Sequence, residues 1–216
     1  MAGKEEVSFA HAADNARPFK SHRYDVFGVK IERSLFLYGE LALWGFIALE
    51  SNPEVTGYCE RPIVIDEIKP RRVVDFWVRS HSGEELWFFL RPSELRWTEQ
   101  EFPPTPAFDA WAAAHNLSIR LHTPESLGIH SLHLRNWGEI IRYLTANLRY
   151  VDAALLRRVS EYSRDACSIG NIQAAFSQDD PILVRTAIFR LLHTGALIGT
   201  DLGSSRLGLD SIVRPT

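Results

Sequence analysis

The chain has 216 residues, of which 45% are hydrophobic and 24% are charged, and its formal net charge is −3. This length exceeds a typical single domain but not two large ones, so we expect one domain of about 120–130 residues and a smaller one. The slightly acidic balance excludes a protein that coats nucleic acid through overall basicity. Residues 126–216 nevertheless hold ten arginines against eight acidic residues, so any nucleic-acid surface is expected there.

Cysteine usage and hydropathy favour a cytoplasmic protein without membrane contact. Cys59 and Cys167 are far apart and lack the paired spacing of a zinc site or disulfide framework. No run of about 18 apolar residues and no signal-type segment occurs. Residues 1–32 are expected to form a partly ordered leader.

In the first half of the chain, the apolar spacing from Ser34 to Ser51 predicts a long helix, which Asn52-Pro53 ends. Residues 61–68 are expected to form a strand. Residues 71–79 and 85–92 alternate as two strands around a turn at 81–83, which predicts a hairpin. With its centre near Ser82, Asp75 would face Phe89, and Arg91 would lie two residues along the same face.

The next segments predict a helix that faces the sheet and then a further strand. The helix covers residues 108–115 and the strand residues 117–122. Thr123-Pro124 is typical of a capped helix start, so another helix is expected to follow. This order of elements predicts an α/β or α+β architecture.

A second unit begins near Asn136 with a run of helical patterns. Helices are expected over 137–148, 150–163, 168–176 and 181–193, the last capped by Asp180 and stopped by Gly195. Segments 196–202 and 206–210 alternate around a Gly-Ser-Ser turn and predict a hairpin. Helices followed by a hairpin outline a winged helix. In the last helix, Ile182 is expected to face the core, and Arg185, Arg190 and His193 to point outward.

Several short motifs occur in a defined order and together carry a family resemblance. They are Leu49-Glu50-Ser51-Asn52-Pro53-Glu54-Val55, Arg61-Pro62, Val74-Asp75-Phe76 and Phe89-Leu90-Arg91-Pro92, with 117–126 and 168–213 downstream. Over residues 33–213 the chain thereby resembles TnsA, the endonuclease subunit of heteromeric bacterial transposases. The resemblance implies a restriction-endonuclease-like (PD-(D/E)XK-type) core with a mixed sheet over 33–128. An α-helical winged-helix domain would then cover 129–216.

The resemblance also implies a set of partners and a metal site. The partners are a DDE-type transposase subunit, an AAA+ ATPase regulator and double-stranded DNA. In the family, a helix glutamate, an aspartate and an acid or amide hold divalent metal, and a lysine orients the water and phosphate. Asp75 matches the aspartate, but Phe89 stands at the expected acid position and Arg91 at the lysine position.

The helix glutamate is displaced as well. Counting back from Pro53 without gaps places it at Ala42, and Glu40 is rotated by about 200° around the helix. Magnesium requires oxygen ligands, and an arginine beside Asp75 would neutralise the remaining one. We therefore expect a degenerate site with no bound metal or cofactor.

Three functions stay open at this point. The first is a catalytically inactive TnsA-like subunit that acts in transposase complex assembly and DNA-end binding. The alternative is a divergent DNA endonuclease that cuts at transposon ends, with Asp75 and Glu40 binding magnesium and Arg91 orienting the phosphate. A free-standing DNA-binding regulator, the third, would bind duplex DNA tightly and in a salt-dependent manner.

Two further sets of residues have alternative interpretations. Asp66, Glu67, Glu84 and Glu85 can rebuild a metal site or serve as ordinary surface acids. Arg185, Arg190 and Arg206 are candidates for contact with DNA phosphates, or are solvated arginines on a protein-binding face. The six tryptophans favour an obligate protein partner.

Overall fold

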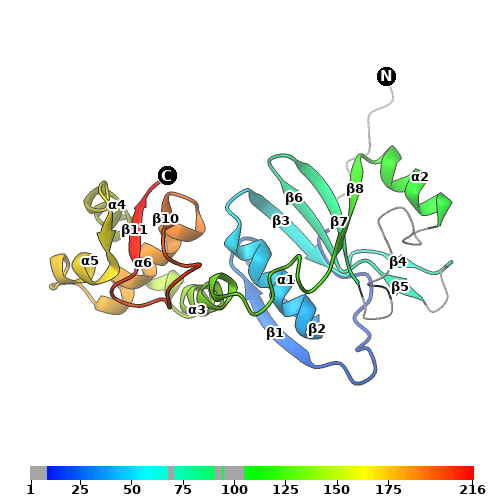
Figure 1. Cartoon of the computed structure of the whole chain (residues 1–216), viewed down its shortest axis with the longest axis horizontal. Coiled ribbons are helices and arrows are strands. Elements are labelled where there is room, and N and C mark those ends of the chain that lie inside the picture. The colour runs from blue at the N-terminus through cyan, green and yellow to red at the C-terminus, as the bar shows by residue number, and fades with distance from the viewer. Residues whose placement is uncertain (1–8, 68–70, 91–93, 95–104) are drawn as a thin grey trace. The chain divides into compact units, whose positions relative to one another are not determined.

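The computed structural model describes residues 9–67, 71–90, 94 and 105–216, and these form two compact units (Figure 1). The sheet unit comprises the described residues up to Leu49 together with Glu54–Ile129. The helical unit comprises Glu50–Pro53 and His130–Thr216. Within the described part of the chain, no helix has the length and apolar character needed to span a bilayer.

The sheet unit is built on a four-stranded mixed sheet, so the expected α/β class is confirmed. The strand order is β3-β6-β7-β8, with β7 and β8 parallel and the other neighbours antiparallel. The sheet and its helices are α1 (Glu40–Ser51), β3 (Val55–Glu60), β6 (Phe76–Ser80), β7 (Gly83–Phe89), α2 (Pro106–Ala114) and β8 (Leu117–His122). Two smaller pairs complete the unit: β1 (Arg23–Gly28) with β2 (Arg33–Tyr38), and β4 (Val64–Ile65) with β5 (Arg72–Val73).

Helices α1 and α2 cover opposite faces of the sheet, as neighbouring residues of β7 show. Successive side chains of a strand point to opposite faces. The ring of Phe88 packs edge-on against Phe108 of α2, with centroids 6.2 Å apart. The ring of Phe89 packs against α1, where a Cβ added to Gly45 would lie 2.4 Å from it. Both phenylalanines are therefore core residues.

The helix predicted over 34–51 is correct only from Glu40 onward. Residues 33–38 form β2, in which Leu35 and Leu37 are buried while Ser34 and Phe36 are exposed. Gly39, with φ +89°, separates this strand from α1. Apolar residues two positions apart fit a strand, and the pairing with β1 selected that conformation over the helix.

Two other predictions around the sheet are also wrong. The strand expected over 61–68 is replaced by β3 one segment earlier, and only Val64–Ile65 is extended there among the described residues. After β8, Thr123 and Ser126 bond each other's backbone N–H groups as a helix start would. Gly128 and His130 adopt positive φ angles, so the chain forms turns over 124–130 and no helix begins before residue 132.

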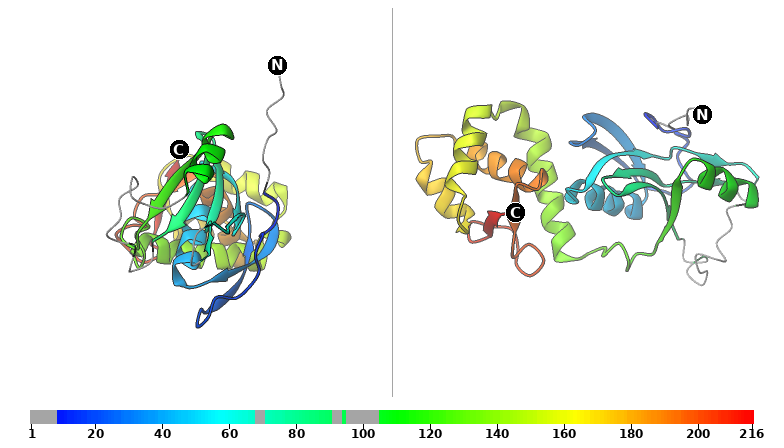
Figure 2. Two further views of the ribbon diagram at one scale, coloured as in Figure 1. Left: turned by 90° about the vertical axis from the view of Figure 1, so that its right-hand side faces the viewer. Right: turned by 90° about the horizontal axis from the view of Figure 1, so that it is seen from above.

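The helical unit consists of helices packed around α6 and a small antiparallel sheet of order β10-β11-β9 (Figure 2). Oxygen atoms of Ser131, Asp152, Ser168 and Asp180 cap α3, α4, α5 and α6. Its elements are α3 (Leu132–Asn147), η1 (Leu148–Tyr150), α4 (Ala153–Tyr162), β9 (Cys167–Ser168), α5 (Ile169–Ala175), α6 (Pro181–His193), β10 (Leu197–Gly199) and β11 (Ile212–Pro215).

Some details of this unit correct the sequence-based expectations. The strand predicted over 206–210 is a loop, and the strand that pairs with β10 is β11. Ile182 is 47% exposed, whereas His193 is buried at 3% exposure. The imidazole is buried because its Nε2 lies 2.6 Å from Oε2 of Glu50, which is itself fully buried. The expectation that His193 points outward is therefore wrong, because its imidazole has a buried hydrogen-bond partner in Glu50.

Candidate functional site

Asp75, the matching aspartate of the motif, lies directly before β6 and joins the sheet through its backbone and its side chain. Its backbone N–H donates to the carbonyl of Trp87 at 2.9 Å. Its carboxylate Oδ2 accepts a hydrogen bond from the backbone N–H of Phe89 at 2.7 Å. The carboxylate therefore continues the β6–β7 ladder by taking the place of a carbonyl oxygen.

The pairing of the hairpin differs by one residue from the predicted one. Ser80 pairs with Gly83 and Phe76 with Trp87, so the centre lies between His81 and Ser82. In this register the residue opposite position 75 is Phe88, not Phe89. The Asp75 carboxylate consequently contacts the main-chain N–H of Phe89 and not its side chain. The Phe89 ring, 4% exposed, lies in the core against α1.

Arg72 is the arginine that the structure places beside Asp75. Its Nη2 lies 3.9 Å from Oδ2 of Asp75, donates to the carbonyl of Phe89 at 2.8 Å and lies 3.3 Å from Oε2 of Glu94. The guanidinium is buried, so its charge acts on both carboxylates with little screening. Arg91, the residue expected in this role, lies outside the described residues.

A cavity of about 20 Å³ opens next to Asp75. Its lining includes Ala42 of α1, which is the position where the gapless count places the helix glutamate. The space suffices for about one water molecule and not for a hydrated divalent cation. A methyl group at position 42 supplies no ligand, so the helix contributes only apolar surface to this cavity.

The other charged residues of the cavity are engaged in ion pairs. Glu60, 5% exposed, receives two hydrogen bonds from Arg33, at 2.9 and 2.5 Å, and this interaction raises the pKa of the arginine. Arg61 binds the carboxylate of Asp14 at 2.6 Å. The Glu60 carboxylate is thus occupied by a bidentate contact with an arginine, which is among the stronger charge-assisted hydrogen bonds.

Glu40 and the acids of the strand ends do not assemble around Asp75. Glu40 is exposed at the start of α1 and accepts a hydrogen bond from Trp44 Nε1 at 3.1 Å. Asp66 pairs with Arg71, Glu84 with Arg79 and Glu85 with Arg120, at 2.9, 2.9 and 3.0 Å. Over the described ranges, no group of three His, Cys, Asp or Glu side chains is positioned to hold a metal ion.

The three candidate arginines of the helical unit occupy different environments. Arg185 is half-buried; its Nη2 donates to Gln173 at 2.9 Å and its guanidinium lies 5.9 Å from the Tyr143 ring centroid. Arg190 is half-buried beside His193 Nδ1 at 3.3 Å. Arg206 is exposed on the loop between β10 and β11. Arg185 and Arg206 line one pocket, and Arg190 lies outside it.

Of the residues that line this pocket, sequence reasoning singled out Arg185 and Arg206 and missed the others, among them Arg135 and Asn136 of α3. The helix was expected to begin at Trp137, although Ser131 provides the cap that starts it earlier. With the start at Leu132, Arg135, Glu139 and Tyr143 recur every four residues on one helix face. The Ser131 cap is the local signal that would have placed Arg135 and Asn136 on this helix.

Comparison with known proteins adds no relative: the sequence matches no protein-family model and no curated protein.

Proposed function

We propose that the chain is a TnsA-like subunit that does not cut DNA and acts in the assembly of a transposase complex. Its partners would be a DDE-type transposase and an AAA+ ATPase regulator, with double-stranded DNA at the element's end. The motif order described above carries the resemblance to this family. The order of α1, three antiparallel strands, α2 and a parallel fourth strand supports a restriction-endonuclease-like core.

The loss of cutting is supported chiefly by the surroundings of Asp75. A metal-dependent nuclease needs several oxygen ligands around a cation. Here Ala42 presents a methyl group, the Phe89 ring is turned into the core, and Arg72 lies beside the aspartate. Asp75 itself acts as a hydrogen-bond acceptor within the sheet.

The helical unit supports a role in protein assembly more than one in reading DNA. The order α4, β9, α5, α6, β10 and β11 supports the proposed winged helix, in which α6 would be the helix that enters the groove. Eight residues of α6, however, are buried within the unit, and Arg185 and Arg190 make internal contacts. DNA contact in this proposal rests on exposed Arg206 and not on insertion of α6.

A consequence for the element follows from the absence of cutting. If this subunit does not cleave, the strand that the transposase leaves uncut stays attached to the donor DNA. The element would then move by a replicative route and not by cut-and-paste.

The test is a cleavage assay with purified protein. Supercoiled DNA and DNA carrying an element end are incubated with magnesium or manganese, with and without the transposase. We expect no cleavage attributable to this chain and no effect of Asp75→Ala on the products. Asp25→Ala, which removes an exposed acid of the same unit whose side chain is 63% accessible, is the matched control.

Two results would contradict the proposal. Cleavage that Asp75→Ala abolishes while the variant remains folded, and that Asp25→Ala preserves, would favour the divergent endonuclease in which Asp75 acts with Glu40 and Arg91. Tight, salt-dependent duplex binding without complex formation with a transposase or ATPase would establish a free-standing regulator.

A further inference from the structure

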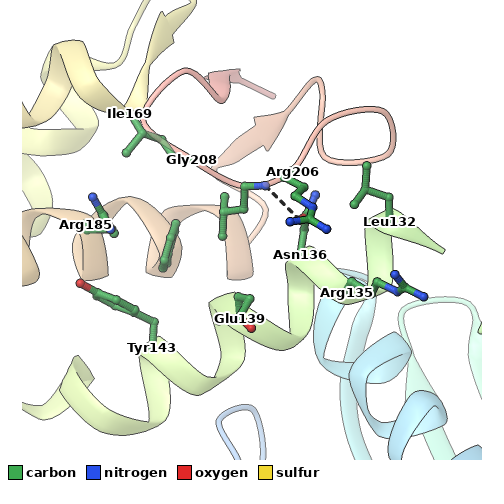
Figure 3. A pocket seen from close by; sticks show the side chains of 11 residues that line it. Leu132, Arg135, Asn136, Glu139, Tyr143, Ile169, Arg185, Arg206 and Gly208 are labelled. Carbon is green, nitrogen blue, oxygen red and sulfur yellow. Dashed lines mark hydrogen bonds between the residues drawn. The ribbon is translucent and has the colours of Figure 1, made fainter. Parts of the chain in front are cut away.

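The helical unit contains a pocket of about 420 Å³ between α3, α6 and the loop that joins β10 to β11 (Figure 3). Arg135 lies on α3, Arg185 on α6 and Arg206 on the loop, so three separate elements each contribute a guanidinium to its lining. Figure 3 shows Arg185 beside Tyr143 at one end of the pocket and Arg206 beside Asn136 toward the other. All of these residues belong to the helical unit.

These three arginines are not neutralised within the described part of the chain. None of them lies within ion-pair distance of a described carboxylate. The acid of the pocket, Glu139, pairs with Arg142, which is not part of the lining. Arg185 in addition keeps a buried Nε–H without an acceptor. The pocket therefore concentrates positive charge that an anion would balance.

The loop that carries Arg206 is held in place before any ligand arrives. The buried Asn136 side chain donates to the carbonyls of Leu202 and Ser205, at 2.8 and 2.7 Å, and accepts from the N–H of Leu207 at 3.0 Å. On its other side the loop touches α5, where Gly170 N–H donates to the Leu209 carbonyl at 2.7 Å. Arg206 thus projects from a backbone fixed on both sides, which lowers the entropic cost of binding.

The remaining lining is apolar and aromatic. The rings of Tyr143 and Phe189 meet edge to face with centroids 5.4 Å apart, and Ile169, Leu132 and Leu207 complete the wall. A volume of about 420 Å³ falls within the usual range of small-molecule sites. The pocket therefore has room for an organic body in addition to an anionic group.

We propose that this pocket binds a nucleoside phosphate, with the phosphate held by Arg206 at one end and the base toward Tyr143 and Arg185 at the other. Guanidinium groups match phosphate oxygens through bidentate hydrogen bonds, and aromatic side chains stack on any base. A duplex backbone is disfavoured as the ligand because Arg185 is half-buried and its Nε is buried, so it is less accessible to a duplex than an exposed arginine. This inference does not depend on a transposase partner.

Calorimetric titration of the full chain with the four nucleoside monophosphates tests the proposal, with inorganic phosphate and the free nucleosides as separate probes. We expect at least one monophosphate to bind, at least about tenfold more tightly than phosphate or the matching nucleoside alone. Arg206→Gln, at an exposed position, should weaken that binding by roughly tenfold, as expected for the loss of one charge-assisted contact. Arg185→Gln, at the end of the pocket that would hold the base, should also weaken it, because a guanidinium favours contact with an aromatic ring.

The control is Arg214→Gln, which removes an exposed arginine of the same unit that does not line the pocket and should leave the affinity unchanged. The proposal is overturned if no monophosphate binds, or if Arg206→Gln and Arg214→Gln bind it equally well. It is also overturned if duplex DNA binds more tightly than every monophosphate and loses affinity in Arg185→Gln, because the pocket would then be a DNA-backbone site.

Discussion

The carboxylate Oδ2 of Asp75 lies 2.7 Å from the backbone nitrogen of Phe89 and accepts its hydrogen bond. The Asp75 side chain therefore supports the sheet by accepting a hydrogen bond from the main chain of β7. The contribution of Asp75 to stability can therefore be measured by unfolding, independently of any assay of DNA cleavage.

Asp75→Ala should lower the free energy of unfolding by about 2 kcal/mol, because it leaves the Phe89 N–H without its charged acceptor. Asp75→Asn keeps an oxygen at that position and should recover part of the loss. Urea unfolding followed by tryptophan fluorescence measures both. Equal destabilisation by the two variants would show that the hydrogen bond is not what Asp75 contributes.

Gly45→Ala should destabilise the sheet unit by about 1–3 kcal/mol, since the new methyl group would lie 2.4 Å from the Phe89 ring. Phe89→Leu in the same chain shortens that side chain and should restore part of the loss. The two single variants and the double variant form a thermodynamic cycle, measured by thermal unfolding. A coupling energy near zero would contradict the close packing of these two residues.

Glu50→Ala should cost about 3 kcal/mol of stability, because it leaves His193 buried without its carboxylate partner. Glu50→Gln preserves a hydrogen-bonding group of the same size and should cost less. Glu54→Ala, at an exposed acid that meets the exposed His81, is the matched control and should change stability by less than about 1 kcal/mol. Chemical denaturation distinguishes these outcomes, and a similar loss for Glu50→Ala and Glu54→Ala would contradict the prediction.

Acidification should destabilise the sheet unit through His122. Burial lowers the pKa of this imidazole to about 4 from an ordinary value of 6.5, and its Nε2 is buried without a hydrogen-bond partner. As the pH falls from 6.5 to 4, the unfolded chain binds a proton on His122 that the folded chain does not, so the free energy of unfolding decreases.

The measurement compares unfolding at pH 7 and pH 5 in the wild type and in His122→Leu, which should lose part of the decrease. His81→Leu removes an exposed histidine of the same unit and should retain the full decrease. If His122→Leu shows the same pH dependence as the wild type, another group is responsible.

The elements that the sequence predicted well are those whose signals are local. The β6–β7 hairpin has a two-residue turn between strands rich in aromatic and β-branched residues, and α2 and α6 begin with a cap followed by proline. The start of α1 was wrong because Leu35 and Leu37 fit a strand as well as a helix, and only pairing with β1 decides between them. The last strand was predicted over 206–210 and lies at Ile212–Pro215, because its pairing with β10 decides where it forms.

The order of the local patterns by itself indicated an α/β or α+β protein with a hairpin that brings Asp75 close to Phe89. Only the tertiary structure decided that Asp75 bonds the Phe89 main chain, that Ala42 lines the same cavity, that Glu50 buries His193 and that three arginines line one pocket. Helix caps and tight turns form between near neighbours in the sequence. The burial of a side chain and the contacts between charged groups depend on residues tens of positions apart in the sequence. These residues become neighbours only when the chain folds.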